Sequence, residues 1–148
     1  MTQNNEPVDL LHRLLDALRR YDWSEVEALW GEDGVIEYPF AGPGMPERLV
    51  GGRRIAEHIA AIYPVRSEVT DVGPVVVHRT EDPATIVAEF TARGRVVRTG
   101  APYELSYLGV LTASGGRIAR YRDHFSPVAA AVATGSVAEL VAALGEAA

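Results

Sequence analysis

The chain of 148 residues contains no cysteine. This absence excludes disulfides, thiolate nucleophiles, zinc–thiolate sites and iron–sulfur clusters. Lysine is also missing, so all 14 basic residues are arginine, and they form no basic stripe long enough to follow a phosphate backbone. Since the net charge is −6, we do not expect nucleic acid as a main partner.

Long apolar runs are missing as well. No run of 18 apolar residues could span a bilayer, and the polar N-terminal stretch 1–6 lacks the pattern of a signal peptide. We therefore expect a cytoplasmic protein with no membrane partner. The length of 148 residues, with 47% hydrophobic and 23% charged residues, predicts one globular domain, 1–148, that needs no metal or disulfide to fold.

Sequence motifs for common cofactors and nucleophiles are not found. The chain has no HExxH, no P-loop, no GxGxxG after a strand and no GxSxG elbow. Its four histidines lie far apart, without a second ligand at metal spacing, so we expect no metal site and no cofactor. Any catalysis would therefore depend on acid/base side chains in a pocket of aromatic and apolar groups.

The periodicity of apolar residues changes along the chain. Leucines at helical spacing predict a helix that starts near Pro7, and Asp22 with Glu25 predicts a capped second helix. The glycine- and proline-rich residues 39–52 predict a long irregular loop, and the tail after Pro127 is weakly helical. Further segments are predicted as a helix at 53–63 and strands at 35–38, 75–77, 85–97, 103–112 and 117–125. This order predicts an α+β fold with helices on one face of a curved antiparallel sheet.

Two acid/base candidates lie in segments with apolar neighbours. His58 shares a helical stripe with Ile55, Ile59 and Ile62, which fits either a hydrogen-bonded core histidine or a pocket acid/base group. Glu104 shares a strand face with apolar side chains such as Leu108. If that face is buried, desolvation raises the pKa of Glu104 and suits it to proton transfer; otherwise it is a solvated glutamate.

A third candidate, Asp123, lies between Tyr121 and Phe125 on one face of the last predicted strand. It fits either a carboxylate in a pocket wall or the partner of a neighbouring arginine. His124 is on the opposite face, which we expect to be at the surface or at an interface. Tyr38, at the end of the first predicted strand, fits either a core aromatic or a hydrogen-bond donor.

The order and spacing of three segments resemble the SnoaL-like branch of the nuclear transport factor 2-like superfamily. They are residues 35–40 (VIEYPF), 50–58 (VGGRRIAEH) and 115–127 (GGRIARYRDHFSP). Within that branch, residues 55–58 and the segments 80–83 and 103–107 look most like the phenazine-biosynthesis A/B proteins. The resemblance implies a cone: a strongly bent antiparallel sheet whose concave side is closed by helices over an apolar pocket.

The resemblance also implies roles for the three candidates. His58 and Glu104 stand where the phenazine proteins have a pocket histidine and an acid/base glutamate, and Asp123 is nearest to the proton-transfer aspartate of SnoaL-type polyketide cyclases. Ile62 replaces a pocket serine of the phenazine proteins, and Tyr38 replaces the base aspartate of ketosteroid isomerases. Steroid isomerisation by that set of residues is therefore not expected.

We therefore expect a cofactor-independent general acid/base enzyme acting on a small, mostly apolar carbonyl or polyketide-type metabolite, by cyclisation, isomerisation or dehydration. Glu104, Asp123 and His58 would carry the chemistry. The expected substrate-binding residues are Trp30, Tyr38, Phe40, Met45, Ile62, Tyr107, Tyr121 and Phe125, and the loop 40–50 is expected to form a lid. A non-catalytic small-molecule binder and a scaffold module remain alternatives on the same fold. A homodimer through the outer sheet face, near Arg120, Arg122 and His124, is expected as well.

Overall fold

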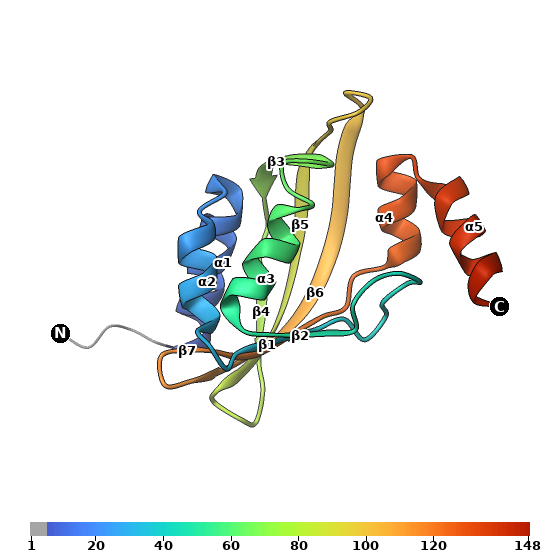
Figure 1. Cartoon of the computed structure of the whole chain (residues 1–148). Helices are drawn as coiled ribbons and strands as arrows, with labels where there is room; N and C mark the ends of the chain where they lie inside the picture. Colours follow the sequence, from blue (N-terminus) through green and yellow to red (C-terminus); the bar gives the residue numbers. More distant parts are fainter. Residues whose placement is uncertain (1–5) are drawn as a thin grey trace.

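The protein folds into helices packed on a curved sheet, as the computed structural model of residues 6–148 shows (Figure 1). Residues 1–5, part of the stretch from which no signal peptide is expected, lie outside the described residues. The helices are α1 (Pro7–Arg20), α2 (Trp23–Trp30), α3 (Gly52–Ala60), α4 (Pro127–Thr134) and α5 (Val137–Ala147). The strands are β1 (Val35–Glu37), β2 (Arg48–Val50), β3 (Ser67–Val72), β4 (Val76–Arg79), β5 (Thr85–Val96), β6 (Pro102–Ser114) and β7 (Arg117–Asp123).

The first three helices form a layer against the sheet because each has one apolar stripe. Leu10, Leu11 and Leu14 of α1 are buried, as are Val26 of α2 and Ile55 of α3. The predicted cap of α2 is present, with the Glu25 N–H donating to Oδ1 of Asp22 over 3.1 Å. At the start of α5, Ser136 makes no side-chain cap hydrogen bond, although the helix forms.

The sheet has seven strands in the order β2-β1-β7-β6-β5-β3, and β4 also pairs with β5. The predicted α+β fold is confirmed, with one addition: β1 pairs with β7 in parallel, so the sheet is mixed. Two short strands were not expected. β2 lies inside the predicted loop 39–52, where residues 48–50 pair with β1, and β3 lies in the polar segment 67–72 at the sheet edge.

The long strands β5 and β6 separate an inner from an outer face of the sheet. On β6, Tyr103, Leu105 and Leu111 are buried under the helices, whereas Glu104 and Ser106 are exposed on the opposite face. The inner face also needs a glycine, because a Cβ atom at position 109 would collide with the hydroxyl of Tyr121. This alternation decides which side chains can reach a pocket beneath the helices.

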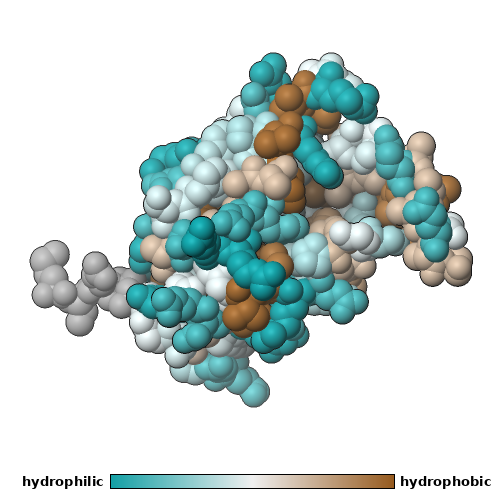
Figure 2. All heavy atoms as spheres, in the orientation of Figure 1, coloured by the Kyte–Doolittle hydropathy of each residue, from teal (hydrophilic) through white to brown (hydrophobic). Residues whose placement is uncertain are grey.

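The C-terminal helices lie apart from the other three (Figure 1). α4 packs on β6, where Ala130 and Ala133 lie against the buried cluster that contains Tyr103 and Leu105. Figure 2 shows the surface hollowed between α3 and α4, with apolar atoms inside the hollow. Among the described residues, no helix is long and apolar enough to cross a membrane.

Candidate active site

Asp123 ends β7 on the inner face of the sheet, together with Tyr121 and Phe125. Its Oδ1 atom is buried and has no hydrogen-bond partner. Burial raises the pKa of Asp123 to about 7, and the backbone of Phe125 offsets only part of this rise. Within residues 6–148 no arginine pairs with this carboxylate, so the ion-pair alternative is wrong, and Asp123 can change its protonation state near neutral pH.

Aromatic rings cover the neighbourhood of Asp123. Tyr38 packs edge-on against Phe125, with ring centroids 6.1 Å apart, and Phe125 in turn lies 6.4 Å from the ring of Tyr107. Burial first and then the charge of Asp123 raise the pKa of Tyr38, so its hydroxyl stays protonated at neutral pH. These rings surround a carboxylate whose Oδ1 atom is buried, while Phe125 and Tyr107 are themselves half-buried.

His58 reaches the same region from α3. Its ring centroid lies 5.7 Å from that of Tyr38, and its Nε2 atom is buried without a partner. Burial lowers the pKa of His58, so the neutral imidazole is favoured. The alternative of a fully hydrogen-bonded core histidine is therefore wrong at Nε2, which is free to bind a ligand atom.

Three tyrosine hydroxyls meet close to Phe125, whose ring lies 6.4 Å from that of Tyr107. The hydroxyl of Tyr107 lies 2.7 Å from that of Tyr63 and 2.9 Å from that of Tyr103. Of these three tyrosines, only Tyr107 is predicted from the sequence to bind substrate. Tyr103 shares the inward face of β6 with Tyr107, so alternation along the strand was enough to place it beside Tyr107. Tyr63, in contrast, follows α3 and is 44 positions from Tyr107 in the sequence, so only the fold brings the two together.

Glu104 does not join this site. It lies on the outer face of β6, where its side chain is 66% exposed and its Oε2 accepts from Nε of Arg93 over 3.2 Å. The prediction that Glu104 shares a pocket with His58 is therefore wrong. The physical reason is that the apolar neighbours which suggested burial, such as the exposed Leu108, line the uncovered side of the sheet.

The remaining predicted binding residues lie in the core, in the loop 40–50 or just after α3. Trp30 and Tyr121 are buried core side chains with rings 6.2 Å apart, and the indole of Trp30 donates to the carbonyl of Val35. Trp30 is only 2% exposed and Tyr121 only 5%. Met45 packs against the core, and Ile62 is half-buried just after α3.

The predicted lid lies next to the C-terminal helices. A Cβ atom at Gly42 would be 3.5 Å from Pro127 and 3.9 Å from Leu140, so the loop rests beside α4 and α5. Phe40 is 61% exposed and covers His124, with ring centroids 5.4 Å apart. His124 has a buried Nδ1 atom without a partner, so it is less exposed than expected. Contact of Phe40 or Met45 with a ligand stays a prediction.

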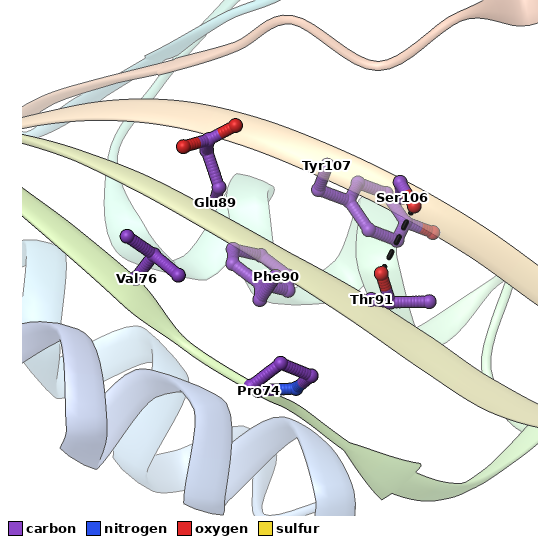
Figure 3. Close-up of a pocket in the computed structure, with 7 residues that line it drawn as sticks. All are labelled: Pro74, Val76, Glu89, Phe90, Thr91, Ser106 and Tyr107. Atoms are coloured by element: carbon purple, nitrogen blue, oxygen red, sulfur yellow. Dashed lines mark hydrogen bonds between the residues drawn. The ribbon is translucent and has the colours of Figure 1, made fainter.

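Two surface hollows lie away from Asp123. One, of about 250 Å³, is on the outer face, where Thr91 and Ser106 share a 2.9 Å hydrogen bond and Glu89 projects from β5 (Figure 3). The other, of about 880 Å³, lies between the start of α3 and the β6–β7 turn. Within residues 6–148, no three His, Asp or Glu side chains come together to hold a metal ion.

The arrangement around Asp123 can move a proton. A carboxyl group with a pKa near the working pH is both a competent base and a competent acid. The neutral imidazole of His58 and the protonated tyrosine hydroxyls supply hydrogen bonds to a bound molecule in a water-poor setting. This combination suits proton transfer next to a polarised oxygen, without need of a further group.

Comparisons with known proteins agree with this architecture. Residues 11–121 match the model of the SnoaL-like domain family. The uncharacterized protein YesE of Bacillus subtilis is 33% identical over 128 residues, which cover 86% of each chain. An uncharacterized PhzA/B-like protein of Pseudomonas aeruginosa, PA3332, is 32% identical over 84% of this chain and 85% of its own.

A solved structure is similar over nearly the whole chain. It is a Bacillus subtilis protein provisionally named an isomerase, which is 32% identical and has a TM-score of 0.83. The match covers 92% of this chain and 97% of that one.

Proposed function

Since this chain belongs to the SnoaL-like domain family, we propose that it is a cofactor-independent acid/base enzyme of the isomerase, cyclase or lyase type. Its substrate is a small, mostly apolar carbonyl or polyketide-type metabolite, of the kind made in natural-product biosynthesis. The observation that carries this proposal is Asp123, a buried carboxylate with an unpartnered oxygen and a pKa of about 7 among aromatic rings.

The proposed step is enolisation. The carboxylate of Asp123 takes a proton from the carbon next to the carbonyl group, and the C–H electron pair forms a carbon–carbon double bond. The carbonyl π electrons move to the oxygen, which becomes an enolate oxygen. Asp123, now neutral, returns the proton at another position, so that no external oxidant or reductant is needed. His58 orients the substrate through Nε2.

Deuterium exchange tests this proposal without knowledge of the natural substrate. A panel of small cyclic ketones and β-diketones is incubated with the protein in D₂O, and loss of the α-proton signal is followed by NMR. We expect at least one compound to exchange faster than in buffer. Asp123→Asn should slow that exchange by about 10²- to 10⁴-fold, the usual contribution of one positioned acid/base group.

Glu104→Gln is the matched control, because it removes a carboxylate from the same sheet on its outer face. It should leave the exchange rate unchanged. Exchange that continues at the parent rate in Asp123→Asn contradicts the proposed role of Asp123. If compounds of the panel bind but none exchanges, the non-catalytic binding protein is the correct reading.

We also propose a homodimer through the outer face of the sheet. This face exposes Val76 and Leu108 beside paired charges such as Arg120 with Glu37 and His78 with Glu89. Light scattering should give twice the 16.0 kDa of the chain at micromolar concentration. A mass equal to one chain excludes the dimer under those conditions.

A further inference from the structure

Three tyrosine hydroxyls in mutual, partly buried contact are unusual, because each brings only one O–H to donate. Tyr63 and Tyr107 lie 2.7 Å apart, Tyr103 and Tyr107 2.9 Å, and Tyr63 and Tyr103 3.3 Å. Tyr107 therefore makes the two short contacts and stands at the centre of the group. We call these three hydroxyls the tyrosine cluster.

Counting donors shows what the tyrosine cluster can offer. The two short contacts use two of the three O–H groups, whichever residue donates in each. The third O–H is then left with at most the 3.3 Å contact between Tyr63 and Tyr103, which is long for an O–H···O hydrogen bond. One O–H can therefore donate to a bound molecule. The hydrogen bonds among the three hydroxyls polarise that O–H and strengthen the hydrogen bond it donates.

The tyrosine cluster lies beside the proposed base. Phe125, two residues after Asp123, packs on Tyr107, and Asp123 is close enough for its charge to raise the pKa of Tyr63 further. Burial raises the pKa of Tyr63 and Tyr107 well above the ordinary value, so both hydroxyls stay protonated and act as donors at neutral pH. Tyr107 also stacks on Phe90, with ring centroids 5.3 Å apart.

We propose that the tyrosine cluster is the subsite for the substrate oxygen, and that it selects a flat compound whose oxygen carries negative charge as an enolate or phenolate. The donated O–H stabilises the charge that develops when Asp123 removes the neighbouring proton. The ring of Phe125, two residues from Asp123 and 6.4 Å from the ring of Tyr107, gives such a flat compound an apolar surface. The enolate role rests on the proposed function, but binding of a preformed phenolate does not.

Binding of substituted phenols tests this subsite directly. A series of phenols of similar size and increasing acidity, including the coloured 4-nitrophenol, is titrated into the protein, and dissociation constants are plotted against phenol acidity. We expect affinity to rise with acidity in the parent protein. Tyr107→Phe should flatten this dependence and weaken the most acidic phenol by about 10- to 100-fold, as expected for a hydrogen bond to a charged group.

Two further variants keep this result interpretable. Tyr63→Phe removes a different hydroxyl of the tyrosine cluster. It should flatten the dependence of affinity on phenol acidity in the same way, and it replaces Tyr107→Phe as the test if that variant does not fold. Tyr21→Phe is the matched control, because its hydroxyl accepts from the Val69 N–H, away from the cluster, and it should bind phenols as the parent does.

The proposed subsite and the proposed enolisation can be contradicted independently of each other. If a folded cluster variant binds the whole phenol series as tightly as the parent, or if the parent shows no dependence on phenol acidity, the subsite is wrong whatever the enzyme does. If phenols depend on the cluster but no carbonyl compound exchanges deuterium, the subsite stands and the enolisation proposal is contradicted.

Discussion

The inner and outer faces of the sheet place carboxylates in opposite environments, one buried and one exposed to solvent. Asp123, under the helices, has a buried and unpartnered oxygen and a pKa raised to about 7. Glu104, on the outer face, is 66% exposed and paired with Arg93. A carboxylate is therefore a reactive group with a raised pKa on the inner face and a solvated ion-pair partner on the outer face. The difference arises because helices cover only the inner face.

The largest expected effect is on the pH dependence of catalysis. As a base, Asp123 must be ionised, so kcat/KM should fall about tenfold for each pH unit below its pKa of about 7. A pH profile of deuterium exchange measures this directly. Glu104→Gln should show the same profile, because Glu104 does not face the substrate. A flat profile between pH 5 and 8 would show that another group acts as the base.

Asp123 should also lower stability as the pH rises. Its pKa in the folded state, about 7, lies above the ordinary 3.8, so unfolding releases a proton between these values and is favoured by rising pH. One pKa unit corresponds to about 1.4 kcal/mol, so the penalty reaches about 4 kcal/mol above pH 7. Asp123→Asn should remove it.

Urea unfolding at pH 5 and pH 8 measures this penalty. Asp123→Asn should raise the free energy of unfolding at both, and by about 2–3 kcal/mol more at pH 8. An equal gain at the two pH values would mean that Asp123 does not titrate between them in the folded state.

Close packing distinguishes the inner face as well. Gly109→Ala places a methyl group against the Tyr121 hydroxyl and should cost about 1–3 kcal/mol of stability. Gly145→Ala is the control, since a Cβ atom there meets nothing and α5 gains helix propensity. Thermal unfolding of both variants provides the measurement. A stable Gly109→Ala protein would show that Tyr121 can move aside.

The smallest effect is expected on the outer face. Glu104→Gln breaks an exposed ion pair with Arg93 and should change the free energy of unfolding by less than about 1 kcal/mol. The change should shrink further at high salt, because exposed charges are screened. A loss of several kcal/mol would mean that the interface of the proposed homodimer extends over this ion pair and buries it.

Sequence patterns predicted most of the fold but only part of the site. Helices and long strands have clear apolar periods, and the placement of Asp123 beside Tyr121 and Phe125 followed from alternation along one strand. β3 was missed because its segment 67–72 is polar, as suits a strand at the sheet edge. Alternation alone does not say which face the helices cover.

That limit explains the error at Glu104 and the omission of the tyrosine cluster. The side of β6 with Glu104 and Leu108 contains enough apolar residues to be read as buried, yet it faces outward. The tyrosine cluster joins Tyr63 after α3 to β6, a contact between residues 40 and 44 positions apart that no local period encodes.

The pKa of Asp123 is the quantity on which this account depends most directly. It can be measured by following the side-chain carboxyl ¹³C shifts of the parent protein from pH 3 to 9, with Asp123→Asn assigning the resonance. We predict one aspartate carboxyl that titrates near pH 7, absent from the variant. If the Asp123 resonance instead titrates near the ordinary 3.8, the carboxylate is solvated and the proposed acid/base site is wrong.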